Sequence, residues 1–586
     1  MLSSYSTEKR ESVLTLAGRF IRGFFCIVGF LTVAVLCAFF YKGFSAGNPP
    51  PVQPNTALNV SFNTDFYESR PTDIVSAMTF GTSPTVTDLT SALYRAAEDP
   101  NVAALVAYLP KTNLTMAQVQ EIRAAVATFR AKGKKTVAFS PSFGELGGGL
   151  TEYYLASAFE EIRLQPTGEV GIAGVSMEAR FLKKALEKWG IRPSFSARHE
   201  YKSGADALAA ESMSAAEREN ITAMMNDLLG QIAADIAEAR KMPVEKALDL
   251  IKNGPYFADR ALQEGLVDKV EYVDVLEREV KEKYADMISL FDYDDRTAPN
   301  PSKKDPVFAY VPATGIIGNG ESIFGGEADS SFLGISTVGE ALRAAADDET
   351  VKAIIVRLDS PGGAYTPSDT LMREMKYVRE TSEKPIVCSI ASEAASGGYF
   401  LSLGCDKVFA LPASITGSIG VFGGKVVIGE LLDRLDVKTE AIEIGKNAGM
   451  FSVSKDFSPE QKDFFNKSLD RVYDDFTRKV ADRRGLSSER IDAAARGRVF
   501  TGKEALEKGL IDGLGGMKEA VSAAAELAQT GAPLPLVEYP SQPTRFEMIE
   551  DFLMNGKMKV SGILPKIKMM MRNGFDVLCP FTLSFK

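Results

Sequence analysis

Residues 385–424 read PIVCSIASEAASGGYFLSLGCDKVFALPASITGSIGVFGG, and residues 135–175 read KTVAFSPSFGELGGGLTEYYLASAFEEIRLQPTGEVGIAGV. The two stretches align on a tyrosine (Tyr399 and Tyr153), a proline and two glycines, at a constant offset of 246 residues. Only the second stretch has a serine before its glycine pair, Ser396, and Leu150 occupies the matching position in the first. We expect chemistry in the second copy, with a contribution from the first.

The repeat continues on both sides of these stretches. SALYRAAEDPNVAALVAYLP (91–110) matches EALRAAADDETVKAIIVRLD (340–359), and YFADRALQEGLVDKV (256–270) matches VFTGKEALEKGLIDGL (499–514). Each first-pair segment has apolar residues three and four apart and then a short apolar run, which indicates a helix followed by a strand. Strands that alternate with helices predict a tandem α/β protein with largely parallel sheets.

The composition excludes several functions. The 586 residues carry a net charge of −10 with no basic stretch in the body of the chain, which argues against nucleic-acid binding. One histidine and five scattered cysteines form neither a disulfide framework nor a zinc-ligand pattern. We therefore expect no metal and no cofactor.

An apolar segment near the N-terminus predicts a membrane anchor. Residues 23–41 contain no charge and are long enough to cross a bilayer of about 30 Å. Four basic residues precede the segment, so residues 1–22 are expected in the cytoplasm and the rest across the membrane. A cleaved signal peptide is the alternative, but the run is long and its exit is bulky, which favours an uncleaved helix.

Composition also divides the rest of the chain. Residues 42–57 are a proline-rich linker, 58–291 the first copy, 292–305 an interdomain linker and 306–529 the second copy. Residues 530–586 form a C-terminal extension whose last part is basic and rich in Met, Leu, Ile and Phe. This extension is expected either on an anionic membrane surface or against a neighbouring subunit.

Two turns in the second copy have the residues that acyl chemistry needs. The apolar run at 354–359 leads into SPGG (360–363), and the run at 386–390 leads to Ser396-Gly397-Gly398 before a helix. A serine at such a strand-to-helix turn is exposed at the helix N-terminus, and the N–H groups of Gly363 and Gly397 are suited to bind an oxyanion. The alternative is that Ser396 merely caps the helix.

A nucleophilic serine needs a base, and the second copy has no histidine. Three candidates remain open from the residues alone. His199 and Lys202 lie in the first copy, the lysine 52 residues after Leu150, and Lys446 lies 50 residues after Ser396. A free lysine is uncharged only about 0.04% of the time at pH 7, so a lysine base requires burial between domains or subunits.

SPGG, ASGGY, TGSIG (416–420) and the lysine segment, in this order, resemble the signal peptide peptidase A family in its long tandem form. The resemblance implies two crotonase/Clp-protease-like ββα-spiral domains. It assigns the nucleophile to Ser396, the base to Lys202, the oxyanion hole to Gly363 and Gly397, and orientation of the lysine to Ser418. Lys446 lies near the sequence position at which the short, single-copy members of the family have their lysine.

The resemblance further implies a membrane-anchored serine endopeptidase that degrades signal peptides left after their release by signal peptidase. It implies a homotetramer in the bacterial inner membrane, with a single span, a cytoplasmic N-terminus and periplasmic catalytic domains. Two other functions remain as alternatives. One is a crotonase-type acyl-CoA enzyme, and the other is a non-catalytic membrane scaffold that binds peptides.

Overall fold

The computed structural model describes residues 50–71, 73, 76, 77, 80, 83–145, 148–541 and 576–578. The predicted cytoplasmic residues 1–22, the predicted span 23–41 and most of the C-terminal extension lie outside the described residues. Within the described part of the chain, no helix combines the length and the apolar character that crossing a bilayer requires.

The first copy is built on a parallel sheet with strand order β8-β4-β3-β2-β1-β9. Its strands are β1 (Thr56–Ser61), β2 (Val102–Tyr108), β3 (Lys135–Ser140), β4 (Glu161–Leu164), β8 (Lys269–Val270) and β9 (Asp286–Ser289). Its helices are α3 (Val86–Glu98), α4 (Met116–Ala131), α5 (Leu150–Ala156), α6 (Lys183–Lys188), α7 (Asp206–Ala209), α8 (Ala215–Ala239), α9 (Val244–Asn253), α10 (Ala258–Gln263), α11 (Val273–Lys283) and α12 (Leu290–Thr297). The strands β5 (Glu169–Val170) and β7 (Tyr256–Phe257) form a separate pair.

The second copy repeats this order on its own sheet as β20-β16-β15-β13-β10-β21, and β17 and β19 extend the sheet from β15 along a second path. Its strands are β10 (Val307–Thr314), β13 (Val351–Ser360), β15 (Ile386–Ala395), β16 (Lys407–Ala410), β17 (Ile415–Gly417), β19 (Val499–Thr501), β20 (Gly513–Leu514) and β21 (Leu536–Glu538). Its helices are α13 (Ile335–Asp347), α14 (Tyr365–Ser382), α15 (Gly397–Ser402), α16 (Gly429–Arg434), α17 (Pro459–Arg484), α18 (Ser488–Ala494), α19 (Gly502–Glu507) and α20 (Met517–Leu527). The tandem α/β prediction is therefore confirmed.

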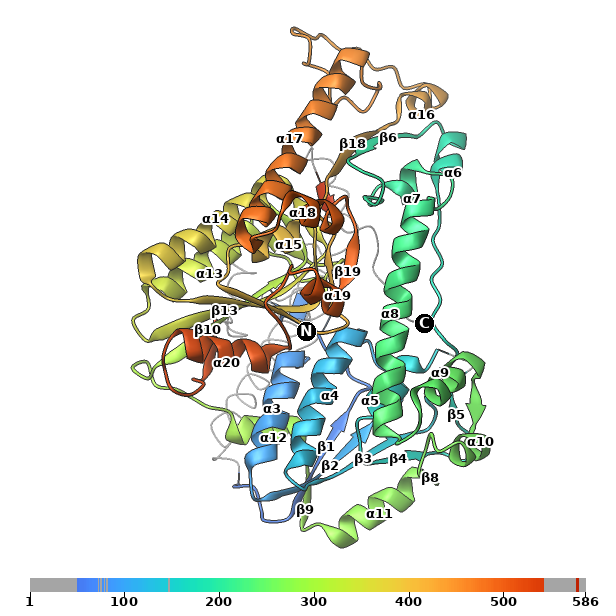
Figure 1. The fold of residues 1–586 in the computed structure, drawn as a ribbon, viewed down its shortest axis with the longest axis vertical. Helices are drawn as coiled ribbons and strands as arrows, with labels where there is room; N and C mark the ends of the chain where they lie inside the picture. The colour runs from blue at the N-terminus through green and yellow to red at the C-terminus, as the bar shows by residue number, and fades with distance from the viewer. Residues whose placement is uncertain are drawn as a thin grey trace, which may run out of the picture. The chain divides into compact units, whose positions relative to one another are not determined.

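A third sheet joins the copies, with strand order β12-β11-β14-β22-β18-β6. Its strands are β6 (Arg192–Ala197), β11 (Ile316–Gly318), β12 (Phe332–Gly334), β14 (Gly362–Ala364), β18 (Phe422–Val427) and β22 (Asp576–Leu578). Strand β6 belongs to the first copy and pairs antiparallel with β18 of the second along six residues. The first copy thus extends a sheet of the second copy, near the top of Figure 1.

Local sequence explains why corresponding elements form in both copies. Helix α3 begins after Thr85, whose side chain accepts a hydrogen bond from the Asp88 N–H in a capping box, and it buries Leu89 and Leu93 on one face. Strand β13 is buried at nine of its ten positions, as expected for a central parallel strand covered on both faces. Helices α3 and α13 precede β2 and β13 in the same way, which matches the first repeated segment.

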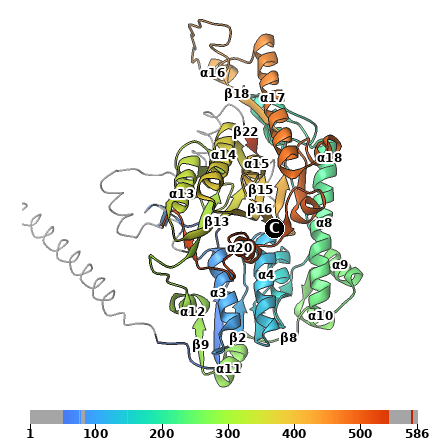
Figure 2. The ribbon, with the colours of Figure 1, turned by 60° about the vertical axis from the view of Figure 1, so that its left-hand side comes forward.

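Helices from each copy also lie against the other copy. The long helix α8 contacts β19, and the two lie side by side in Figure 1. The N-terminus of α20 lies beside α4, where the Met517 N–H donates to Glu121 Oε1 (2.7 Å); Figure 2 shows α20 next to α3 and α4. The described parts of both copies, from Gln53 onward, form one compact unit.

Two predicted boundaries can be compared with these elements. The predicted link 292–305 contains most of helix α12, because Leu290 and Tyr293, three residues apart, are buried together. The predicted C-terminal extension begins with an ordered part, since β21 pairs with β10 and forms the last strand of the second copy's sheet. The positions of the domain boundaries otherwise stay predictions.

Candidate active site

Ser396 stands between β15 and α15, as predicted, but it is fully buried and not exposed, because Lys202 of the first copy packs against its hydroxyl. Its backbone has φ 55° and ψ −114°, a conformation that costs a non-glycine residue about 1–3 kcal/mol and that persists mainly at functional sites. The Ser396 N–H donates to the Gly417 carbonyl (2.8 Å), which fixes the turn. The side chain makes no capping hydrogen bond to α15, so the capping alternative does not account for this serine.

Lys202 meets Ser396 in the space between the copies. Its Nζ lies 2.6 Å from Ser396 Oγ, and it donates to the carbonyl oxygen (2.9 Å) and the hydroxyl (3.0 Å) of Ser418. Lys202 is 3% exposed, and both serines are fully buried. The structure therefore brings the predicted nucleophile, base and orienting serine together in a buried crevice.

The pairing of β6 with β18 positions Lys202 beside the second copy. After β6, the Arg198 N–H donates to the Val421 carbonyl (2.9 Å) and the Tyr201 N–H to the Arg496 carbonyl (3.2 Å). Gly497 has φ +91°, and an added Cβ there would collide with the Lys202 backbone. The segment that carries Lys202 is thus held on both sides by backbone of the second copy.

The two predicted oxyanion residues lie in contact. A Cβ added to Gly397 would fall 3.0 Å from the Gly363 N and 2.7 Å from Ser368 Oγ. A Cβ added to Gly363 would collide with the carbonyl oxygen of Ile317 on the neighbouring strand β11. Both positions require glycine, because the β13–β14 turn and the start of α15 approach one another too closely for a side chain.

The structure places the other candidate bases elsewhere. Lys446 is exposed, and its carbonyl oxygen accepts a hydrogen bond from Gln461 Nε2. His199 is also exposed and lies against the Tyr473 ring, with 4.4 Å between ring centroids. In the first copy, Leu150 and Glu152 lie in the first turn of α5, the helix that corresponds to α15, and both are buried.

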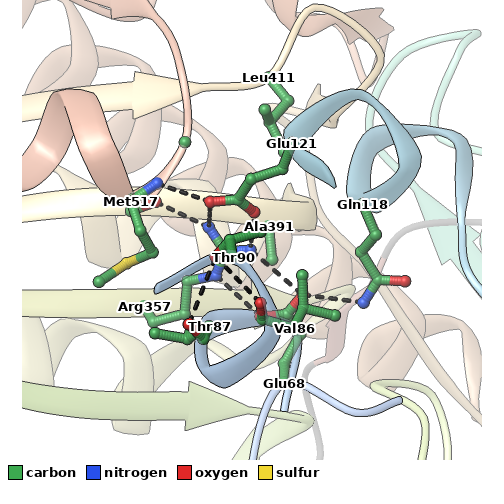
Figure 3. A network of polar contacts seen from close by, with 12 residues as sticks. Glu68, Val86, Thr87, Thr90, Gln118, Glu121, Arg357, Ala391, Leu411 and Met517 are labelled. Carbon is green, nitrogen blue, oxygen red and sulfur yellow. Dashed lines mark hydrogen bonds and ion pairs between the residues drawn. The ribbon is translucent and has the colours of Figure 1, made fainter. Parts of the chain in front are cut away.

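A buried ion cluster between the two copies was not predicted from the sequence. Arg357 on β13 is fully buried; its Nε donates to Glu68 Oε2 (2.8 Å) and its Nη2 to Glu121 Oε2 (2.6 Å), and both glutamates belong to the first copy. Figure 3 shows the guanidinium between the two carboxylates, with Gln118 donating to Glu68. The signal in the sequence was an arginine within the apolar run IIVRLD, where a charge requires buried partners.

The described residues contain no group of three histidine, cysteine or carboxylate side chains that is suited to hold a metal ion. The candidate site instead consists of hydroxyls, an amine and backbone N–H groups. This set of groups is sufficient for nucleophilic acyl transfer, in which a serine attacks a carbonyl and a neighbouring base moves the proton.

Comparison with known proteins supplies the family. The model of peptidase family S49 matches residues 128–286 and 379–531, one stretch in each copy. The chain belongs to peptidase family S49. It is a serine endopeptidase of the signal peptide peptidase A (Protease 4) group, and the two matches confirm the tandem duplication.

Three relatives illustrate the similarity. The chain is 28% identical over 470 residues to the chloroplastic serine protease SPPA of Arabidopsis thaliana, covering 77% of this chain and 66% of that protein. It is 30% identical over 481 residues to Protease 4 of Salmonella typhi, covering 79% and 75%. It is 32% identical over 201 residues to a putative signal peptide peptidase SppA of Enterococcus faecium, covering 34% and 58%.

Proposed function

We propose that this protease hydrolyses peptide bonds with Ser396 as the nucleophile and Lys202 as the general base. The observation that carries the proposal is the 2.6 Å separation of Lys202 Nζ and Ser396 Oγ in a buried crevice. Burial favours the uncharged amine that a base requires, since a buried ammonium loses its hydration. The two Ser418 oxygens hold Nζ in place beside the hydroxyl.

The reaction follows from these positions. Uncharged Lys202 takes the Ser396 proton while Oγ attacks the peptide carbonyl carbon, and the N–H groups of Gly363 and Gly397 stabilise the negative oxygen. The ammonium then gives the proton to the departing amine, which leaves an ester on Ser396. Water, deprotonated by the same lysine, hydrolyses the ester and regenerates the hydroxyl.

The substrate is an extended peptide that adds as a strand beside β14. In the structure this place is taken by the chain's own strand β22, which pairs antiparallel with β14 at Gly362–Ala364 and also pairs with β18 at Phe422. Backbone pairing of this kind accepts many sequences, because main-chain groups make the hydrogen bonds. Such pairing suits a protease that recognises an extended apolar segment and does not require one particular residue.

The substrates we propose are signal peptides that remain in the membrane after their release by signal peptidase. The name of the Enterococcus faecium relative and the apolar segment at 23–41 support this proposal. The proposal includes an inner-membrane anchor with periplasmic catalytic domains, a homotetramer, and the crotonase/Clp-type spiral as the finer fold class.

An activity-based probe tests the nucleophile. Full-length protein in detergent is treated with a fluorophosphonate, and the adduct is mapped by mass spectrometry. We expect labelling at Ser396 and none in Ser396→Ala. Labelling confined to another serine would refute the assignment, and no labelling of folded protein would favour the acyl-CoA enzyme or the scaffold.

A further inference from the structure

A cavity of about 750 Å³ lies between the inactive centre of the first copy and the second copy. The first copy contributes residues 110–118 and the turn around Glu152, which correspond to the SPGG and serine turns of the second copy. The second copy contributes Asp359, directly before SPGG, and Ser392 and Glu393, just before Ser396. The cavity therefore joins the degenerate site to the strands that lead into the candidate active site.

The lining is strongly acidic. Among its described residues seven are carboxylic acids and one, Lys111, is basic. Glu68 is already paired with Arg357. The other six are Glu145, Glu152, Glu327, Asp329, Asp359 and Glu393. Glu145 and Glu327 are exposed, whereas Glu152, Asp359 and Glu393 are 4–6% exposed, so the carboxylates extend from the surface to the interior.

Glu152 carries an oxygen without a partner. Its Oε1 accepts a hydrogen bond from the Thr112 N–H (3.1 Å), but its Oε2 is buried and has no hydrogen-bond partner among the residues that the structure describes. Glu152 lines the cavity, and only 6% of its surface is exposed. A buried carboxylate oxygen in this state is costly unless a donor reaches it. A donor that enters the cavity would supply that hydrogen bond.

The neighbouring acids are disfavoured as carboxylates, and a positive charge in the cavity would favour their ionised forms. Burial raises the pKa of Glu152, and burial followed by repulsion from Glu68 raises the pKa of Asp359 to about 7. Burial and the charges of Asp359 and Asp329 raise the pKa of Glu393 well above its usual value. Lys111 and Arg357 act in the opposite direction on Glu152 and Asp359 respectively.

We propose that this cavity binds a lysine or arginine side chain of the peptide substrate, so that the inactive first-copy centre is a recognition pocket for a basic residue. The proposal rests on the proposed function and narrows its substrate class to apolar peptides that carry a nearby positive charge. Signal peptides have this pattern, a basic segment followed by an apolar one. Glu393 precedes Ser396 by three strand residues, or about 10 Å, which a few residues of extended peptide span.

A pair of synthetic peptides tests the proposal. Both contain one apolar sequence, preceded in one by two lysines and in the other by two glutamines. With full-length wild-type protein in detergent, we expect kcat/KM for the lysine peptide to be about 10-fold higher or more, since charge-assisted hydrogen bonds in a buried site discriminate strongly. In Glu152→Gln this ratio should fall to about 3-fold or less.

The matched control is Glu160→Gln, an exposed carboxylate of the same copy outside the cavity, which should keep the wild-type ratio. Glu145→Gln, an exposed lining position, replaces Glu152→Gln if the latter does not fold, and should also lower the ratio. Equal kcat/KM for the two peptides in wild type would overturn the recognition pocket and leave the protease assignment intact.

If the chain is not a protease, the peptide assay shows no cleavage, which differs from equal cleavage of the two peptides. If wild type cleaves neither peptide, calorimetric binding of both peptides to Ser396→Ala decides the question independently. Tighter binding of the lysine peptide supports the pocket without the reaction, and equal binding refutes it. Tight binding of free spermidine together with equal peptide affinities would indicate a polyamine site and would also refute the proposal.

Discussion

Replacement of Arg357 by methionine should weaken the contact between the two copies and lower the free energy of unfolding. The guanidinium is fully buried, and its partners Glu68 and Glu121 have side chains only 1% and 4% exposed. Without the arginine, two carboxylates of the first copy face an apolar strand of the second with no compensating charge. Removing one partner of a buried pair typically costs about 3–5 kcal/mol, and two stranded acids favour the upper part of that range.

The assay is urea unfolding of full-length protein in detergent, followed by circular dichroism, with fluorophosphonate labelling of Ser396 measured in parallel. We expect Arg357→Met to lower the unfolding midpoint and to reduce labelling at urea concentrations where wild type is still labelled. The control is the triple variant Arg357→Met, Glu68→Gln, Glu121→Gln, which removes all three charges and should recover most of the loss. A single variant within about 1 kcal/mol of wild type, or a triple variant as unstable as the single one, would refute the reasoning.

Three further predictions concern the site itself. Ser418→Ala removes one of the two Ser418 contacts to Lys202 and should lower kcat about 5- to 15-fold with little change in KM, as steady-state kinetics would show. Gly397→Ala places a Cβ 2.7 Å from Ser368 Oγ and 3.0 Å from the Gly363 N, so the folded variant should lose about 10²–10³-fold in kcat in the same assay; a kcat near wild type would contradict the oxyanion assignment. The raised pKa of Asp359, about 7, means that the folded state holds a proton which the unfolded state releases near pH 4, so stability should fall between about pH 4 and 7 and stay low above. Asp359→Asn keeps an acceptor for two backbone N–H groups and should remove the Asp359 contribution to this fall, on the order of 4 kcal/mol, in thermal midpoints measured against pH; an unchanged slope would contradict it.

Repeat patterns in the sequence predicted the duplicated sheet and singled out Ser396, but they left three candidate bases open. The duplicated sheet and the serine turn follow from features that are local in sequence. Short apolar runs, glycine turns and a constant offset define corresponding turns in each copy, and the resemblance supplied the lysine. The geometry agrees with this pairing, with Lys446 and His199 both exposed.

Features that depend on contacts between distant segments were not predictable in the same way. The pairing of β6 with β18, the Arg357 cluster and the acidic cavity each join residues that are about 230 or more positions apart. No local pattern specifies such partners, because a strand edge or a buried charge can be satisfied by many segments. Helix α12 was also missed, since its charged sequence hides the buried pair Leu290 and Tyr293.

The central claim is that an amine from the first copy activates the serine of the second. The most direct measurement is the rate of peptide hydrolysis by folded Lys202→Met, compared with wild type and with Lys446→Met, which removes an exposed lysine of the second copy. We predict a loss of about 10²–10⁴-fold for Lys202→Met and an unchanged rate for Lys446→Met. A Lys202→Met enzyme that keeps the wild-type rate, or a Lys446→Met enzyme that alone loses it, would contradict the account.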